Sequence, residues 1–193
     1  MKGMSVIALL AVVFSFACAQ ADTLTWKASA GGKWSDAANW STDGTHTVPQ
    51  SGDTIKINSL KSGETYENDI EGLSCPHIEF GGSASTPYPQ IKGKKIVLTG
   101  GWNALSSASG RYTCAIPFEL PLGPDGNPTN RFAFTGGRMQ QDGVLSGPGL
   151  LYVQNANYYT PNIACTYSGG TYMTGGTIDP SKAGCFGSGD VTV

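Results

Sequence analysis

The sequence predicts an all-β fold in which short strands stack as the coils of a β-solenoid. Residues 144–193 give the clearest signal, because short apolar pulses recur there between glycine pairs and single glycines. Within each pulse, apolar residues alternate with small or polar ones, which is the two-residue period of a half-buried strand. The glycines can supply the positive φ of tight turns. No pulse is long enough to build a core alone, so we interpret this segment as units of a stacked array.

The chain begins with the features of a cleaved secretion signal. Lys2 precedes an apolar run at residues 6–16, which has the length of a signal core and is too short to span a bilayer. Residues 19–21 (AQA) form a small-x-small cleavage site, with Asp22 as the expected first mature residue. A cut after Ala19 is the alternative. The signal predicts a secreted or surface protein, and we expect no transmembrane segment in the mature chain.

Composition narrows the class of protein. Removing residues 1–21 from the 193-residue chain leaves 172 residues, enough for one domain with its own core. The formal net charge is −2, and the loss of Lys2 makes it −3. Nothing in this balance suggests a nucleic acid or an anionic membrane as a partner. Charged residues make up only 13%, which is typical of a secreted β-protein with a polar, uncharged surface.

The mature chain keeps an even number of cysteines, which permits two disulfides in an exported protein. Their positions are Cys75, Cys114, Cys165 and Cys185. We favour a disulfide between Cys165 and Cys185, because twenty residues is about one coil of a solenoid. The alternative is that all four are separate buried thiols acting as small hydrophobic side chains.

Residues 22–58 are predicted to form a tryptophan-rich cap over the first coil. Trp26, Trp34 and Trp40 lie within fifteen residues. An open first coil would expose both its core and its backbone hydrogen bonds, so a solenoid needs a closed end. A turn at residues 48–53 then leads into a strand at residues 54–58, where isoleucine alternates with polar residues.

Further short strands are predicted along the chain, separated by glycine- and proline-rich turns. No window after the signal shows helical apolar periodicity. Short glycine-linked strands favour parallel or mixed coils over a β-sandwich, which would have longer strands and hairpin dipeptides. The expected strands are at residues 77–80, 94–99, 111–118, 131–135 and 144–153.

Residues 145–153 (LSGPGLLYV), 167–178 (YSGGTYMTGGTI) and 186–193 (FGSGDVTV) resemble the autotransporter-associated β-strand repeat. That family has an L-x-G-x-G-x-L opening, a Y-x-G-G-T centre and a closing L-G-x-G-x-V-x-V. Residues 32–40 and 49–57 are similar to the segment that precedes such repeats in large bacterial surface proteins. Together the similar segments cover about half of the mature chain.

The resemblance implies a right-handed parallel β-helix passenger that is exported and either displayed at the outer membrane or released. Family members are normally long, with several repeats and a C-terminal barrel or anchor. This sequence carries one repeat and stops within or just after its last motif. We therefore divide the chain into a signal (1–21), cap strands (22–58), solenoid coils (59–143) and a truncated repeat (144–193).

The densest acidic cluster comprises Glu64, Glu67, Asp69 and Glu71. The last three alternate and would share one strand face, as a calcium or sugar site requires. Like charges on a strand also block edge-to-edge pairing, and we favour that interpretation.

The remaining titratable residues give little sign of catalysis. His46 and His77 stand apart from any Ser/Asp or Cys constellation in the sequence. Asp53 follows Gly52 and is interpreted as a turn cap that bonds the backbone. No Cys/His spacing suggests zinc and no glycine pattern suggests a phosphate loop. We expect no enzyme activity, no catalytic residue, no metal site and no cofactor.

Aromatic residues suggest a glycan contact. An exposed row of them could stack on sugar rings, and Tyr158 and Tyr159 are the favoured pair because asparagines surround them. The alternative is that the rings pad the flank of the solenoid. The candidates are Trp102, Tyr152, Tyr158, Tyr159, Tyr167 and Tyr172.

The leading functional hypothesis is an exported, non-enzymatic β-helix that acts as a scaffold or adhesin-like passenger. Its partners would be extracellular glycans or other surface proteins. The alternatives are a polysaccharide-binding or polysaccharide-degrading protein on the same scaffold, and a truncated gene fragment without independent function. Because an array that stops at Val193 leaves its last coil unpaired, we also expect self-association at that end.

Overall fold

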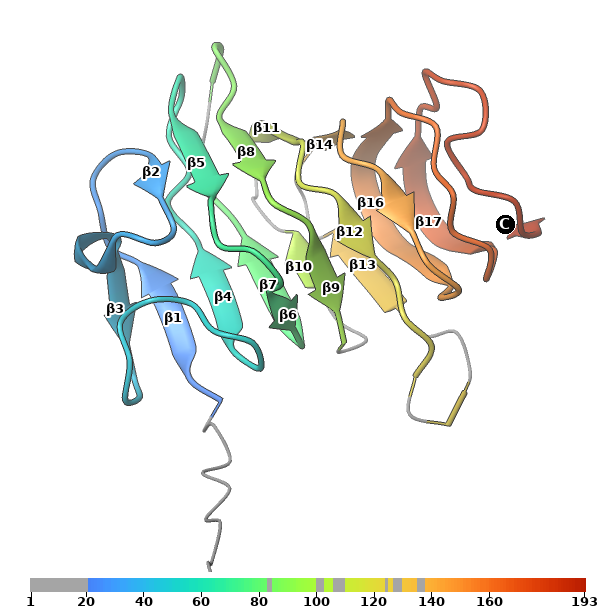
Figure 1. Cartoon of the computed structure of the whole chain (residues 1–193). Coiled ribbons are helices and arrows are strands. Elements are labelled where there is room, and N and C mark those ends of the chain that lie inside the picture. Colours follow the sequence, from blue (N-terminus) through green and yellow to red (C-terminus); the bar gives the residue numbers. More distant parts are fainter. Residues whose placement is uncertain are drawn as a thin grey trace, which may run out of the picture.

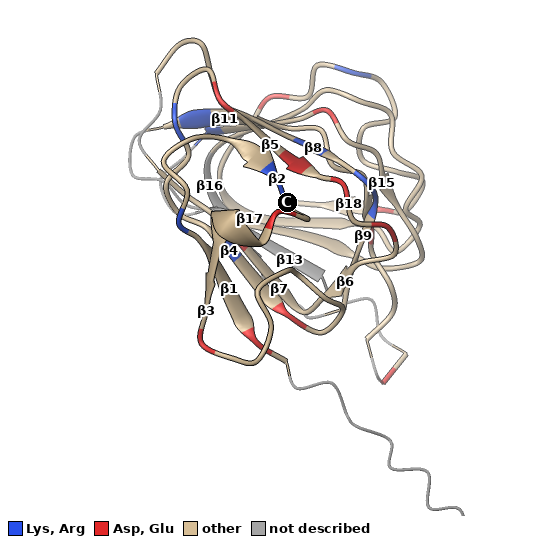
Figure 2. Ribbon diagram, turned by 60° about the vertical axis from the view of Figure 1, so that its left-hand side comes forward, with Lys and Arg blue, Asp and Glu red and all other residues tan. Residues whose placement is uncertain are grey.

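A computed structural model shows a parallel β-solenoid of about five turns (Figure 1). The structure describes residues 21–82, 85–99, 103–105, 110–123, 125–126, 130–134 and 138–193. In Figure 2, which is turned toward the N-terminal coils, the coils superimpose around a shared interior. Among the described residues there is no helix with the length and apolar character needed to cross a membrane.

The strands lie on three faces, which the chain visits in the same order in each coil between residues 54 and 146. The first face consists of β1 (Thr23–Trp26), β4 (Thr54–Ile57), β7 (His77–Phe80), β10 (Asn103–Leu105), β13 (Asn130–Phe134), the start of β16 (Leu151–Pro161), β17 (Thr171–Ile178) and β18 (Val191–Thr192). The second face consists of β2 (Gly32–Lys33), β5 (Thr65–Asn68), β8 (Gln90–Gly93), β11 (Arg111–Cys114), β14 (Arg138–Gln141) and the end of β16. The third face consists of β6 (Ser74–Cys75), β9 (Ile96–Leu98), β12 (Phe118–Glu119) and β15 (Leu145–Ser146).

Parallel pairing places equivalent residues of successive coils directly above one another. Leu24, Ile55 and Ile78 form one such inward column, and all are at most 1% exposed. The alternating burial of β1, β4 and β7 is the two-residue period predicted from the sequence. The core is therefore a set of stacked apolar columns, each continued by the next coil.

The last coils settle into a regular repeat. Leu151 pairs with Thr171, and Thr171 pairs with Val191, so each coil here takes 20 residues. At the corner that leads into the first face, a Cβ on Gly169 would lie 2.4 Å from the Gly149 carbonyl carbon. A Cβ on Gly189, in the next coil, would lie 2.4 Å from the Gly170 nitrogen. Only glycine lets the corners of successive coils approach this closely, which gives the repeat its glycine spacing.

The N-terminal end is closed by β3 (Trp40–Thr42), which pairs antiparallel with the outer edge of β1. Asp36 caps a short 3₁₀ helix, η1 (Ala37–Asn39), which leads into β3. Trp34 and Trp40 are fully buried, with edge-to-face centroids 5.8 Å apart, and Trp26 lies 4.9 Å from Trp40. The predicted tryptophan cluster at this end is confirmed.

Strand positions agree with the sequence-based expectations at β4 and β7 and differ at the corners. The predicted strands at 111–118 and 144–153 are each two strands on different faces. Pro117 and the Gly147-Pro148-Gly149 turn interrupt them, because proline lacks an N–H and glycine permits a sharp bend. Alternation alone does not reveal such a corner.

We expect Trp40→Ala to lower the free energy of unfolding by about 3–5 kcal/mol, because it removes a fully buried ring from the cap. Urea unfolding followed by far-ultraviolet circular dichroism would measure the change. Leu122→Ala is the control, since Leu122 is 45% exposed, and its effect should stay within about 0.5 kcal/mol. Equal unfolding midpoints for the two variants would contradict a stabilising role for the cluster.

Candidate ligand-binding surface

A column of aromatic and arginine side chains crosses four coils on the outside of the second face. Arg111 pairs with Arg138, and Arg138 pairs with Tyr158. Tyr88 lies two residues before Gln90, which pairs with Thr113, so Tyr88 is level with Arg111. We call these four residues, Tyr88, Arg111, Arg138 and Tyr158, the Tyr–Arg column.

Strand alternation turns the column outward. In β11 and β14, Tyr112 and Met139 follow the two arginines and are each 2% exposed, facing the core. Each guanidinium lies over a tyrosine ring: Arg111 is 5.1 Å from the ring centroid of Tyr88, and Arg138 is 5.0 Å from that of Tyr158. These cation–π contacts hold the four side chains as one layer on the surface.

The two arginines place like charges side by side. They are paired residues of neighbouring strands, which lie about 4.8 Å apart, and like charges in that arrangement are destabilising. Within the described part of the chain, neither guanidinium forms an ion pair with a carboxylate. Arg111 donates instead to Gln140 Oε1, at 2.9 Å. The column therefore favours an anionic group above it.

Polar side chains run beside the column and are already ordered by one another. Gln140 Nε2 and Asn162 Nδ2 each donate to Asp142 Oδ1, at 3.0 Å. Ser181 donates to Asn162 Oδ1, which extends this row by one coil. The Tyr158 hydroxyl donates to Asp179 Oδ2 at 3.2 Å. A ligand on this face would meet stacked rings next to fixed amide and hydroxyl groups.

Of the glycan-contact candidates, the structure turns Tyr158 and Tyr159 to opposite sides of β16. Tyr158 is half-buried in the Tyr–Arg column, whereas Tyr159 is 1% exposed and faces the core. Burial raises the pKa of the Tyr159 hydroxyl well above its usual value. Its ring cannot stack on a sugar from this position, because adjacent residues of a strand point to opposite faces. Trp102 lies outside the described residues.

The other aromatic candidates divide in the same way. Tyr167 is fully buried. Tyr152 and Tyr172 stack on the outside of the first face, with centroids 5.2 Å apart and planes at 23°. A hollow of about 560 Å³ lies beside this pair, bounded by Ser168 and Asp190 among others. This second aromatic surface lies on the last coils.

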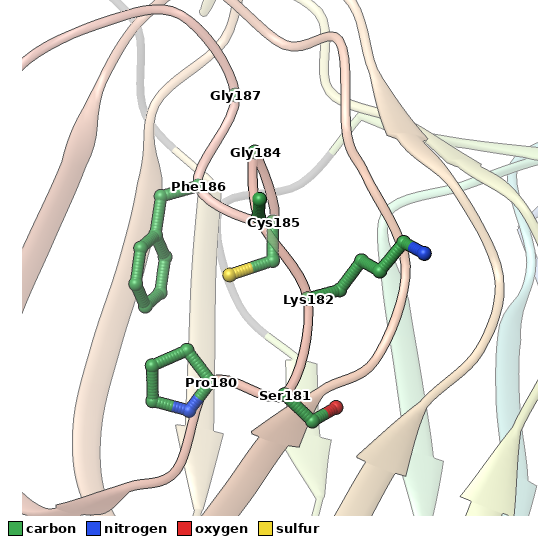
Figure 3. Close-up of a pocket in the computed structure, with 8 residues that line it drawn as sticks. Pro180, Ser181, Lys182, Gly184, Cys185, Phe186 and Gly187 are labelled. Carbon is green, nitrogen blue, oxygen red and sulfur yellow. The ribbon is translucent and has the colours of Figure 1, made fainter.

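All four cysteines are buried and free in the structure. Cys165 and Cys185 lie in successive coils, as their spacing predicted, and the Cys165 amide donates to the Gly184 carbonyl at 3.0 Å. Figure 3 shows the Cys185 thiol pointing toward the rings of Phe186 and Pro180, inside the loop that encloses a hollow of about 470 Å³. Lys182 points away from this hollow. The disulfide between Cys165 and Cys185 stays a prediction.

The acidic cluster is dispersed. β5 ends at Asn68, so Asp69 and Glu71 do not continue its face. Asp69 accepts from both the amide and the hydroxyl of Ser35, and Glu71 lies 3.3 Å from Lys94 Nζ. In the described ranges, no three His, Cys, Asp or Glu side chains are grouped so that they could hold a metal ion.

The interpretation of His46 as isolated is wrong. Its Nδ1 lies 2.9 Å from Asp22 Oδ2 and its Nε2 lies 2.7 Å from Asp53 Oδ2. Sequence distance concealed this cluster, because Asp22 immediately precedes β1, whereas the other two residues belong to the loop before β4. Asp53 also accepts from the Gln50 amide at 2.7 Å, which confirms its expected role as a turn cap.

Sequence reasoning missed Tyr88, Arg111 and Arg138. The signal was available in their spacing, since 23, 27 and 20 residues separate successive members of the Tyr–Arg column. Each interval is about one coil. Aligning these four residues across successive coils requires the length of each coil. The coil lengths vary too much in this part of the chain to be deduced from the sequence.

Comparison of the chain with protein-family models, with curated proteins and with solved structures found no match. The fold thus rests on the structure, and the resemblance to autotransporter repeats rests on the sequence motifs alone.

We expect a protein consisting of residues 22–193, purified under oxidising conditions, to show two free thiols after denaturation, those of Cys75 and Cys114, because the predicted disulfide would join Cys165 and Cys185 in adjacent coils. Thiol titration in denaturant, with peptide mass spectrometry, would count them. Cys165→Ser should raise the count to three by releasing Cys185. Four thiols in the wild-type chain would contradict the disulfide.

In the native protein, Cys75 and Cys114 should resist alkylation at pH 8. Burial raises the pKa of each thiol to about 12, and the thiolate is the reactive form. Mass spectrometry after iodoacetamide treatment, with and without urea, would measure the protection. Rapid labelling in the native state would contradict the burial of these two side chains.

Proposed function

We propose that this chain is an exported, non-enzymatic β-solenoid that acts at the cell surface or outside the cell as a scaffold, and that its second face binds an anionic extracellular glycan. The Tyr–Arg column is the observation that carries the proposal. It combines two aromatic rings with two guanidinium groups at equivalent positions of successive coils. Such an array suits a chain molecule that meets several coils at once.

The chemistry of the column favours a carboxylated or sulfated sugar over a neutral one. Arginine presents planar donors that match carboxylate and sulfate oxygens. An anion between Arg111 and Arg138 would relieve the repulsion between the two guanidinium groups. The tyrosine rings offer apolar surface to the face of a sugar ring, and the row formed by Gln140, Asp142 and Asn162 offers hydrogen bonds to its hydroxyls.

The finer assignment, an autotransporter-like passenger, is supported by the repeat-like motifs of residues 145–193. In the solenoid these motifs fall on consecutive coils, and Gly147, Gly169 and Gly189 lie at corners where coils approach closely. The secretion signal supports export. If the chain is such a passenger, we expect its solenoid to be right-handed.

We expect purified protein to bind polygalacturonate, a uronate polymer, and not dextran, which is neutral. Arg138→Gln should weaken binding about tenfold, as the loss of one charge-assisted contact predicts, and Tyr158→Ala should weaken it similarly. Isothermal titration calorimetry at low and high salt would measure both, with binding weaker at high salt.

Lys95→Gln is the charge-matched control, because Lys95 pairs with Glu119 on the third face, at 2.6 Å. Its binding should stay within about twofold of the wild type, which is less than 0.5 kcal/mol. If Arg138→Gln and Lys95→Gln lowered the affinity equally, binding would depend only on the net charge of the protein. That result would contradict a binding site on the second face. Unsaturated or shortened uronate products, with or without calcium, would overturn the non-enzymatic part of the proposal.

We also expect a protein consisting of residues 22–193 to self-associate through its last coil. β17 pairs with β18 only at Thr171 and Tyr172, and the uncovered part borders a hollow lined by Met173, Ile178 and Val193 among others. Unpaired strand edges invite pairing with another chain.

Light scattering should show dimers or larger species. Val191→Lys should reduce them, whereas Leu122→Lys, at a similarly exposed apolar residue elsewhere, should not. A monodisperse monomer would contradict this expectation.

A further inference from the structure

A buried cluster of charged groups fixes the start of β1. Asp22 and Asp53 are 4% and 1% exposed, and the His46 ring bridges their carboxylates at 2.9 and 2.7 Å. Asp22 Oδ2 also accepts from the Thr45 amide at 2.6 Å. The cluster joins the first residue of the first coil to the loop that enters the second.

The geometry fits an imidazolium between two carboxylates. Each ring nitrogen of His46 faces one carboxylate oxygen, and an ionised carboxylate only accepts hydrogen bonds, so with both aspartates ionised both ring nitrogens donate. In that arrangement the cluster holds two negative charges and one positive charge.

No other side chain in the described residues balances the remaining charge. Neither Asp22 nor Asp53 forms an ion pair with a lysine or arginine. Ionisable groups around the cluster include the buried Cys75 thiol and the exposed carboxylate of Asp43, which accepts from the Thr23 amide at 2.7 Å. Lys56, whose charge acts on Asp43, forms its own ion pair with Glu79 at 3.7 Å. Leaving a buried charge without a partner is strongly destabilising.

The remaining partner is the Asp22 nitrogen, which lies 3.0 Å from Asp53 Oδ1. We propose that removal of residues 1–21 converts this nitrogen into an α-ammonium group that pairs with Asp53 and completes a neutral, buried four-charge cluster. Ala21, on the other side of the bond, is exposed. This inference rests on the proposed export, because only an exported chain meets a signal peptidase.

The processing step is a hydrolysis. Water adds to the Ala21 carbonyl, the Ala21–Asp22 C–N bond breaks, Ala21 leaves as a carboxylate and the Asp22 nitrogen takes up protons to become an ammonium. The new charge lies where the first coil is held to the second, since the Thr54 amide donates to the Asp22 carbonyl at 2.9 Å. Maturation thus stabilises the closed end of the solenoid.

The test compares residues 22–193 with a free N-terminus against the same chain acetylated at its N-terminus. Acetylation removes the charge and should lower the melting temperature by several degrees, about 3–6 °C for a charge-assisted bond in a domain of this size. In Asp53→Asn the difference should vanish. In Asp43→Asn, the neighbouring control, it should persist. Equal melting temperatures for the free and acetylated chains, or a difference that survives in Asp53→Asn, would overturn the proposal.

A second measurement does not depend on the folding of a variant. The α-amine of the free chain should resist acylation by an N-hydroxysuccinimide ester in the native state and react in urea, as read from the mass of the N-terminal peptide. Rapid native acylation would overturn the buried pairing.

N-terminal sequencing of protein exported from its full-length precursor separates this inference from the proposed function. A first residue of Asp22 supports both. A first residue of Gln20 overturns the ammonium pairing and leaves export intact. Precursor retained inside the cell with residues 1–21 overturns export itself, while the comparison of free and acetylated chains still tests the pairing.

Discussion

Backbone hydrogen bonding between successive coils is the constraint on which the rest of this structure depends. Each strand of a coil leaves one edge to be bonded by the next coil, and parallel pairing does this in a fixed register. A fixed register means that side chains at equivalent positions must stack, inside and outside. The inward columns, such as Leu24, Ile55 and Ile78, make the core. The outward columns make surfaces whose chemistry repeats along the axis.

The same constraint creates two ends, which this chain treats differently. At the N-terminal end, β3 covers the free edge of β1, and the tryptophan cluster fills the interior beneath it. The cluster of Asp22, His46 and Asp53 then ties the entry of the chain to the turn before β4. At the other end, β18 covers only the first part of β17, and Val191 and Val193 remain exposed.

The sequence predicted the architecture because the strongest signals were local. Alternation identified β4 and β7, glycine groups identified turns, and three close tryptophans identified the closed end. It could not place corners, so β11 and β12 were merged into one strand, as were β15 and part of β16. It also could not align distant coils, since their lengths vary between 20 and 31 residues from one first-face strand to the next. For this reason Arg111, Arg138 and the partners of His46 were missed, and Tyr159 was assigned to the surface.

The Tyr–Arg column and the buried cluster of Asp22, His46 and Asp53 differ in where their unbalanced charges lie. In the Tyr–Arg column, two like charges lie side by side at the surface, where water and salt screen them. The solenoid tolerates that arrangement without an internal partner, so a partner from outside the chain can bind there. In the buried cluster, solvent cannot compensate an excess charge, so the balancing group must come from the chain itself. On this ground we propose that the two arginines bind a ligand, and that the two aspartates pair with the α-ammonium group of the processed chain.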